Sequence, residues 1–148
     1  MNVAIAVPEI RHFISNTGIN QNLCSMKWIG RKVHGYLDYI VGALLIAVPL
    51  IVDGDMNNVA VLVPVFLGAG TILYSFFTDY EMGGIKIIPF KGHLFIDMVN
   101  GIFLAASPWL FHFHDTVYLP HVAVGVMEMM VVLLTDPDVK FGKGLTVT

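Results

Sequence analysis

Two pairs of histidine and aspartate residues, each pair separated by about one helical turn, carry the most evident chemistry in this sequence. His34 precedes Asp38, and His93 precedes Asp97, and both pairs stand in largely apolar stretches. Side chains at positions i and i+4 share one face of a helix. Imidazole and carboxylate groups at this spacing suit Zn²⁺, Mn²⁺ or Fe²⁺. Glu128 is a further acidic residue within an apolar stretch.

Three interpretations of these five residues stay open. In the first, each aspartate holds its neighbouring histidine and a helix-end amide by hydrogen bonds, and the group is structural. In the second, Asp38, Asp97 and Glu128 handle protons or ions inside a membrane, where unpaired carboxylates are costly. In the third, a divalent metal or a haem is bound, with His34 and His93 as ligands from two equivalent helices.

A second group of histidines surrounds the short polar segment 112–118. His112 and His114 form an HxH pair, and His121 follows a few residues later. Three imidazoles this close in sequence can bind Zn²⁺ or Cu²⁺. Neither a cysteine nor a second HxH pair reinforces the group, so an ordinary polar loop is the alternative interpretation.

Apolar segments long enough to cross a bilayer must position these side chains. The chain has 148 residues, of which 56% are hydrophobic and 13% are charged, whereas about 25% are charged in a typical soluble domain. A hydrocarbon core of about 30 Å requires about 20 apolar residues of helix. Four segments meet or approach that length: 33–52, 59–78, 87–111 and 119–135. The sequence therefore predicts an all-α, integral membrane four-helix bundle with the lipid bilayer as a partner.

The basic residues predict the orientation of these segments. All eight Lys and Arg residues lie outside the two hairpin tips, 53–58 and 112–118. Because short cytoplasmic loops carry the Lys/Arg excess, we expect the N-terminus, the central loop and the C-terminus to be cytoplasmic. The net charge of −3 offers no basic surplus for nucleic acid, and the single cysteine, Cys24, excludes an intrachain disulfide.

Depth within the bilayer brings the ionisable residues of different segments to one level. With a rise of about 1.5 Å per residue, Asp38 and Asp97 lie about 6–8 Å inside the cytoplasmic boundary and Glu128 lies about 10 Å inside it. A cluster of His34, Asp38, His93, Asp97 and Glu128 in the cytoplasmic half of the membrane is therefore geometrically feasible.

An internal repeat relates the two halves of the chain. The His-x₃-Asp-x₃-Gly pattern at 34–42 recurs 59 residues later, and Thr78-Asp79 recurs 57 residues later. The matched landmarks predict tandem parallel repeats at 27–82 and 83–138, after an N-terminal extension (1–26) and before a cytoplasmic tail (139–148). Glu128 breaks the symmetry, because the first copy has Thr71 at that position.

Small residues on the same helix faces predict close helix packing. Glycine allows two helices to approach closely, and neighbouring polar groups can then form hydrogen bonds across the contact. The glycines expected at such contacts are Gly42, Gly68, Gly101 and Gly125.

A short motif near the end of the third apolar segment resembles that of a known family. Ser107-Pro108-Trp109 ends a segment that contains Asp97 and Gly101, and this pattern is similar to the SPW-repeat integral membrane proteins. The resemblance covers roughly 27–136, and the first copy keeps only the proline of the triplet, in Val48-Pro49-Leu50. It implies a small bacterial inner-membrane protein of helical hairpins. It implies no activity and supplies no catalytic residues.

These observations favour a non-enzymatic membrane protein with an accessory or scaffold role, either as a homo-oligomer or with a membrane-protein partner. A proton- or ion-conducting subunit and a metal- or haem-binding redox protein are the two alternatives. The sequence requires no cofactor. Met26-Lys27-Trp28 also suggests an alternative start at Met26, which is a hypothesis for N-terminal mass spectrometry.

Overall fold

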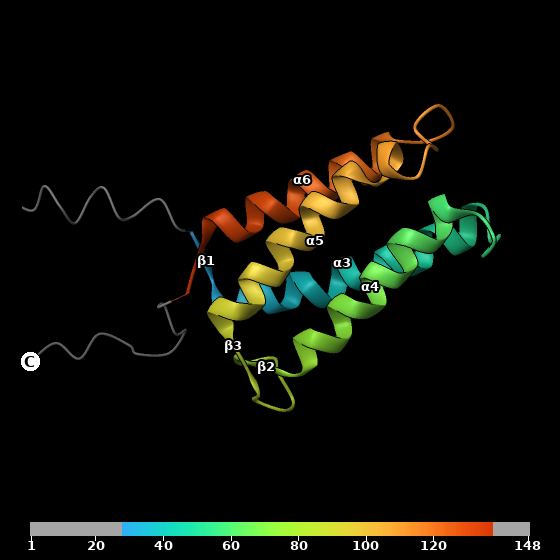
Figure 1. Cartoon of the computed structure of the whole chain (residues 1–148). Coiled ribbons are helices and arrows are strands. Elements are labelled where there is room, and N and C mark those ends of the chain that lie inside the picture. The colour runs from blue at the N-terminus through green and yellow to red at the C-terminus, as the bar shows by residue number, and fades with distance from the viewer. Residues whose placement is uncertain (1–27, 138–148) are drawn as a thin grey trace, which may run out of the picture.

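A computed structural model describes residues 28–137. Its helices are α3 (Arg31–Val52), α4 (Val59–Phe76), α5 (Phe90–Leu110) and α6 (Leu119–Leu134) (Figure 1). Each helix begins and ends within about one turn of its predicted segment. The predicted extension 1–26, the predicted tail 139–148, Cys24 and the hypothesis of a start at Met26 lie outside the described residues.

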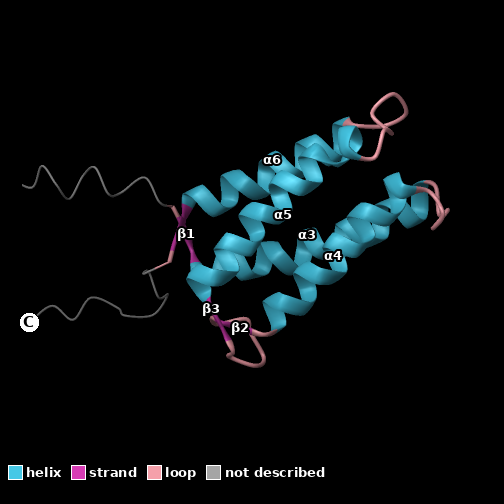
Figure 2. Ribbon diagram, viewed as in Figure 1, coloured by secondary structure: helices cyan, strands magenta, loops and turns pink. Residues whose placement is uncertain are grey.

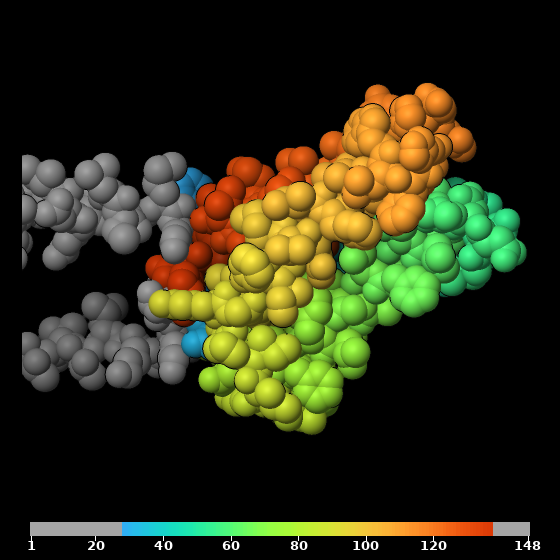
Figure 3. All heavy atoms as spheres, in the orientation of Figure 1, coloured from blue at the N-terminus to red at the C-terminus, as the bar shows by residue number. Residues whose placement is uncertain are grey.

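The helices form two antiparallel hairpins, which confirms the predicted all-α four-helix fold. Helix α3 packs along α4, and α5 packs along α6. Both hairpin tips lie at one end of the molecule, and the segments that connect or precede the hairpins lie at the other end (Figure 2). The atoms of the two tips form separate lobes, whereas the hairpins pack together towards the opposite end (Figure 3).

Four two-residue strands, absent from the sequence prediction, join the hairpins at the end opposite the tips. They are β1 (Ile29–Gly30), β2 (Thr78–Asp79), β3 (Ile88–Pro89) and β4 (Thr135–Asp136). β1 pairs with β4 and β2 pairs with β3, both in parallel. The start of each hairpin is thereby bonded to the end of the other. The duplication itself stays a prediction.

The distribution of polar side chains is reversed relative to that of a soluble protein. Among the described residues, the fully buried side chains include His34, His93, Ser75 and Ser107, whereas large apolar residues such as Phe66 are well exposed. A soluble protein does not expose contiguous apolar surface on this scale. Helices α3, α4 and α5 are long and apolar enough to cross a membrane, and α6 is a shorter apolar helix of 16 residues.

The Ser-Pro dipeptide of the second hairpin has a physical explanation. Pro108 lies inside α5 and has no N–H to donate to the carbonyl oxygen of Leu104, four residues earlier. The Ser107 hydroxyl donates a hydrogen bond of 2.7 Å to that same oxygen. All three residues are fully buried or nearly so. The serine therefore satisfies a carbonyl group that the proline leaves without its helical donor.

The predicted glycine contacts lie where the two helices of each hairpin approach each other. A Cβ atom built on Gly68 would lie 2.5 Å from the Gly42 carbonyl oxygen. Likewise, a Cβ atom built on Gly125 would lie 2.5 Å from the Gly101 carbonyl oxygen. The backbone itself is the obstacle in both cases, so neither helix pair can accommodate a methyl group without separating.

Substitution of Gly125 by alanine is therefore expected to destabilise the protein by about 1–3 kcal/mol, the usual range for overpacking. Gly70→Ala is the matched control, because a Cβ atom there would meet nothing within 4 Å. Removing glycine from a helical position where the added methyl group meets no neighbour is expected to stabilise by about 0.5–1 kcal/mol. Unfolding of both variants in detergent, followed by circular dichroism, measures the difference. Equal stabilities would contradict the packing argument.

Candidate functional site

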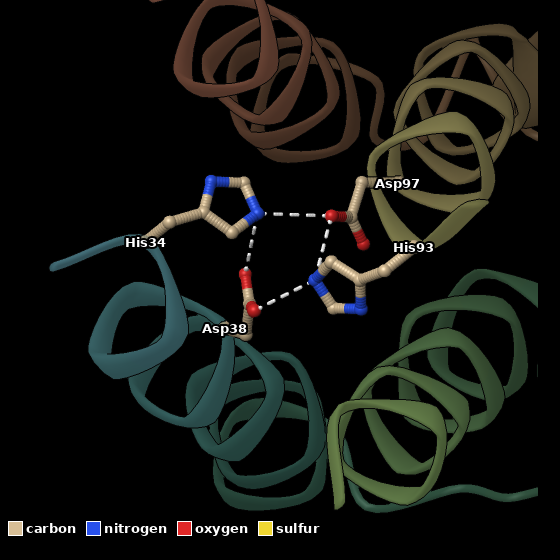
Figure 4. A group of neighbouring side chains, drawn as sticks. All are labelled: His34, Asp38, His93 and Asp97. Atoms are coloured by element: carbon tan, nitrogen blue, oxygen red, sulfur yellow. Dashed lines mark hydrogen bonds and ion pairs between the residues drawn. The ribbon is translucent and has the colours of Figure 1, made fainter. Parts of the chain in front are cut away.

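Two histidines and two aspartates converge between the hairpins. Helix α3 contributes His34 and Asp38, and α5 contributes His93 and Asp97 (Figure 4). One ligand atom from each residue lies within 4.8 Å of the others, and all four residues are buried. The i, i+4 spacing within each helix and the junction of the two hairpins together build this group, which we call the His–Asp cluster.

The distances within the His–Asp cluster are short and nearly symmetrical. His34 Nε2 and His93 Nε2 each lie 3.0 Å from Asp97 Oδ2. His93 Nε2 also lies 3.0 Å from Asp38 Oδ2, and His34 Nε2 lies 3.4 Å from Asp38 Oδ1. Each histidine therefore contacts the aspartate of its own helix and the aspartate of the other helix.

Two threonines determine which nitrogen of each ring faces the carboxylates. The Thr78 hydroxyl donates to the Tyr74 carbonyl oxygen at 2.7 Å, and Thr135 donates in the same way to Val131 at 2.6 Å. Each hydroxyl has only one hydrogen, so it can only accept from the imidazole beside it. Thr78 Oγ1 lies 3.0 Å from Nδ1 of His93. Thr135 Oγ1 lies 2.8 Å from Nδ1 of His34 in the same arrangement. The proton of each neutral ring is therefore on Nδ1.

This tautomer requires a positive charge between the imidazoles and the carboxylates at the centre of the cluster. A neutral ring with its proton on Nδ1 directs a bare Nε2 lone pair at carboxylate oxygens 3.0 Å away, and two acceptors at that distance repel each other. Either each of the two Nε2 atoms also carries a proton, which it donates to the carboxylates beside it, or one divalent metal ion lies among all four groups. Each arrangement gives zero net charge, which suits a buried site.

Hydroxyl groups from α4 and the loop after it support the carboxylates. The Tyr74 hydroxyl donates to Asp97 Oδ1 at 2.5 Å and accepts from the Asn100 amide at 3.2 Å. Ser75 and Tyr80 donate to Asp38 Oδ2 at longer distances of 3.4 Å. Burial raises the pKa of Tyr80, which lies in the loop, so its hydroxyl stays protonated and can only act as a donor to the carboxylate.

Aromatic rings close the end of the cluster that faces the strands. Phe90 stacks on His93 with ring centres 5.7 Å apart and meets His34 edge-on at 5.6 Å. Tyr80 packs against both Phe90 and His93. Arg31 lies over the Phe90 ring and donates to the Asp79 carbonyl oxygen. These rings cover the strand-facing side of the two imidazoles, both of which are buried.

Glu128 lies beside the cluster without joining it. It lines a cavity of about 250 Å³ together with His34, Asp38, Asp97 and Thr71. Within residues 28–137, no hydrogen bond or ion pair reaches the Glu128 carboxyl group. Of the five predicted site residues, the structure thus brings four into contact and places the fifth along the adjoining cavity.

The outer histidines do not converge. His112 is exposed at the tip, with a positive φ of 58°. His114 stacks on Trp109 and forms an ion pair with Asp115 at 3.4 Å. His121 is buried and contacts the Ala60 carbonyl oxygen in the other hairpin. Among the described residues, the only group of three or more potential metal ligands is the His–Asp cluster.

The sequence analysis did not identify Thr78, Thr135, Tyr74 or Tyr80 as site residues. The sequence did contain a signal for Thr78 and Thr135, because a Thr-Asp dipeptide follows the second helix of each half and recurs at the same offset as the other matched residues of that helix. Their contacts cross between hairpins, and no pattern within one helix indicates such a contact.

A bundle of apolar helices with its ionisable side chains facing inward defines a helical membrane protein. The chain belongs to the SPW repeat family, because the family model of the SPW repeat domain matches residues 32–135. This range spans α3 to α6 and includes every residue of the His–Asp cluster. Comparisons with curated proteins and with solved structures give no match.

Proposed function

We propose that this chain is a multi-pass membrane protein that binds one divalent transition-metal ion through His34, Asp38, His93 and Asp97. The observation that supports the proposal most strongly is the orientation of the two imidazoles. Each ring donates from Nδ1 to a threonine and directs Nε2 towards two carboxylates. Metal-binding histidines almost always donate their second N–H in this way, which fixes the tautomer that can coordinate.

The spacing of the four ligand atoms supports a tetrahedral ion. Zinc–nitrogen and zinc–oxygen bonds of about 2.0–2.2 Å place tetrahedral ligands about 3.3–3.6 Å apart. The four imidazole–carboxylate distances here are 3.0–3.4 Å, measured to either oxygen of Asp38, and one ligand atom from each residue lies within 4.8 Å of the others. Small movements of these side chains would therefore place all four around one ion. Two nitrogen and two oxygen ligands suit Zn²⁺, Mn²⁺ or Fe²⁺.

A bare ion fits this site better than a haem does. A haem held by His34 and His93 requires a porphyrin plane between the two imidazoles. Asp97 Oδ2 lies 3.0 Å from both Nε2 atoms and so occupies that plane. We therefore propose a metal ion and not a porphyrin as the ligand.

The proposed topology has four membrane spans, with the His–Asp cluster towards the cytoplasmic side of a bacterial inner membrane. The absence of Lys and Arg from the segments 53–58 and 112–118 supports the orientation. Helix α6, with 16 residues, is shorter than the about 20 residues that a span usually needs. Its pairing with α5 supports a fourth span, because a hairpin returns the chain to the side on which it began.

A second candidate function is proton or ion conduction through the same part of the protein. The position of Glu128, which faces a cavity of about 250 Å³ together with Asp38 and Asp97, favours this candidate. Proton flux into liposomes, compared between the wild type and Glu128→Gln, separates conduction from binding alone. The accessory or scaffold role stays a prediction, and a bound structural ion is compatible with it.

Metal loading of the full chain tests the first proposal. Protein purified in detergent, treated with a chelator and re-equilibrated with Zn²⁺ or Co²⁺ is expected to hold one ion per chain by elemental analysis. The Co²⁺ form is expected to show the visible absorption of a tetrahedral site. His112→Gln is the matched control, because this exposed histidine lies outside the cluster. His93→Gln removes one ligand and is expected to lose the bound metal. The proposal would be contradicted if no ion is bound after loading, or if His93→Gln loses no more metal than His112→Gln does.

A further inference from the structure

The two flanks of the His–Asp cluster, one beside α4 and the other beside α6, differ although the contacts within the cluster are nearly symmetrical. Thr78 and Thr135 each contact a histidine of the cluster and donate to the carbonyl oxygen of the residue four positions earlier. Those earlier residues are Tyr74 in α4 and Val131 in α6, so the two occupy corresponding places beside the cluster. A tyrosine on one flank is thus matched by a valine on the other.

On the α4 flank, Tyr74 fills the space beside the cluster. Its ring packs against His93 with ring centres 5.2 Å apart, and its hydroxyl group donates to Asp97. The same hydroxyl group lies 3.3 Å from Thr71 Oγ1, and Thr71 is itself buried. This flank is therefore occupied by side chains that bond to one another and to the cluster.

On the α6 flank, the smaller valine leaves space, and the cavity of about 250 Å³ lies there. Most of its lining residues belong to α3 and α6, and Val131 is one of them. Glu128 also lines the cavity, and it precedes Val131 by three residues just as Thr71 precedes Tyr74. The pair of residues that fills the α4 flank is therefore replaced on the α6 flank by a pair that leaves a cavity and places a carboxyl group along it.

The carboxyl group of Glu128 is available to bind a cation. Within residues 28–137, no hydrogen bond or ion pair reaches it, whereas every residue of the His–Asp cluster is paired. In the same part of the chain, the enclosed side-chain atoms without a partner belong to Arg31, His114 and His121. The carboxyl oxygens of Glu128 are not among these enclosed atoms, so a small ion can reach them.

A cation that moves through this cavity to the cluster needs a ligand on the way. Aromatic rings cover the strand-facing side of the cluster and Tyr74 fills its α4 flank, whereas the cavity adjoins it on the α6 flank. Apart from the cluster residues, Thr71 and Glu128, the cavity wall is apolar, and an ion without a ligand is very costly in such surroundings. Glu128 lies close enough to Asp38 and Asp97 for their charges to act on it. An ion held by Glu128 is therefore also attracted by both aspartates.

We propose that Glu128 is the transfer ligand of the metal site: its carboxylate binds a divalent ion in the cavity and passes it to and from the His–Asp cluster. This inference rests on the proposed function, because the ion is the one that the cluster binds. Two imidazoles and two carboxylates already complete a tetrahedral set, so Glu128 is not required once the ion has arrived. It therefore lowers the barrier in both directions and accelerates binding and release of the ion by the same factor.

The kinetics of metal exchange in the full chain, purified in detergent, test this inference. Binding of Co²⁺ to the metal-free protein, followed by absorption after rapid mixing, gives the association rate, and addition of excess chelator to the loaded protein gives the release rate. In Glu128→Gln both rates are expected to fall about tenfold, which corresponds to a barrier higher by about 1.4 kcal/mol. The Kd for Co²⁺ is expected to stay that of the wild type, since the ratio of the two rates does not change.

Two further variants complete the test. Glu128→Asp keeps a carboxylate on a side chain that is one methylene shorter, so it is expected to recover part of both rates. Glu81→Gln removes the same charge from an exposed position in the loop before α5 and is the unaffected control. Wild-type rates in Glu128→Gln at an unchanged Kd, or weaker binding caused by faster release alone, would overturn the transfer role and leave the metal site standing. A wild type that binds no Co²⁺ would refute the metal site itself and the transfer role with it.

Discussion

Replacement of Asp97 by asparagine is expected to lower the bound metal to background and to destabilise the protein by about 3–5 kcal/mol, the usual cost of removing one partner from a buried charge pair. Asp97 Oδ2 is the atom that both imidazoles approach at 3.0 Å, so the loss of its charge affects both histidines of the His–Asp cluster. Asparagine has nearly the same shape but carries no charge, which leaves one uncompensated positive charge whether protons or a metal ion occupy the site.

Unfolding measured with and without a metal ion shows whether protons or a metal ion occupy the His–Asp cluster. Unfolding in detergent with and without added Zn²⁺ gives the stabilisation by the ion, which is about 2.7 kcal/mol at a concentration of 100 times Kd. The wild type is expected to gain this stability, and Asp97→Asn is expected to gain none. Asp115→Asn is the control, because this aspartate is 90% exposed in the tip and its ion pair with His114 has little weight. An equal response of the wild type and Asp97→Asn to Zn²⁺ would contradict metal binding.

The helices of this fold were predictable because their signal is local. Runs of apolar residues about 20 long, ended by segments such as Asp53-Gly54-Asp55, indicate spans without any knowledge of tertiary contacts. The two-residue strands were not predictable, since a pair of residues shows no periodicity. Their pairing joins segments as distant as Ile29 and Thr135, and only the assembled bundle brings these together.

The candidate site was predictable to the extent that it follows helical spacing. The i, i+4 relation places His34 beside Asp38 and His93 beside Asp97, and the recurrence of both pairs at one offset indicates a common depth. The cross-helix pairing of each histidine with the other aspartate needed the structure. The same holds for His121, since a sequence can show that Pro64 frees the Ala60 carbonyl group but not which side chain reaches it.

The second large effect is expected on metal affinity when Thr78 or Thr135, which hold the two imidazoles, is replaced. Thr78→Val is expected to weaken metal binding by about 10–100-fold, the usual cost of removing a hydrogen bond that orients a metal-binding histidine. Thr135→Val is expected to have a similar effect, because it holds His34 as Thr78 holds His93. Valine keeps the branched shape and removes the acceptor, so the ring is free to rotate or to move its proton to Nε2. Titration of the chelated protein with Co²⁺, followed by absorption, measures the loss.

Thr78→Ser and Thr116→Val are the controls for this prediction. Serine retains the hydroxyl group, so it is expected to restore most of the affinity, and Thr116 is exposed in the tip, away from the cluster. If only protons occupy the His–Asp cluster, Thr78→Val still loses a buried hydrogen bond and is destabilised, but Co²⁺ binding is then absent from the wild type as well. A drop in affinity that serine reverses therefore requires both a bound ion and a fixed tautomer, since neither protonated imidazoles nor freely rotating ones would produce it.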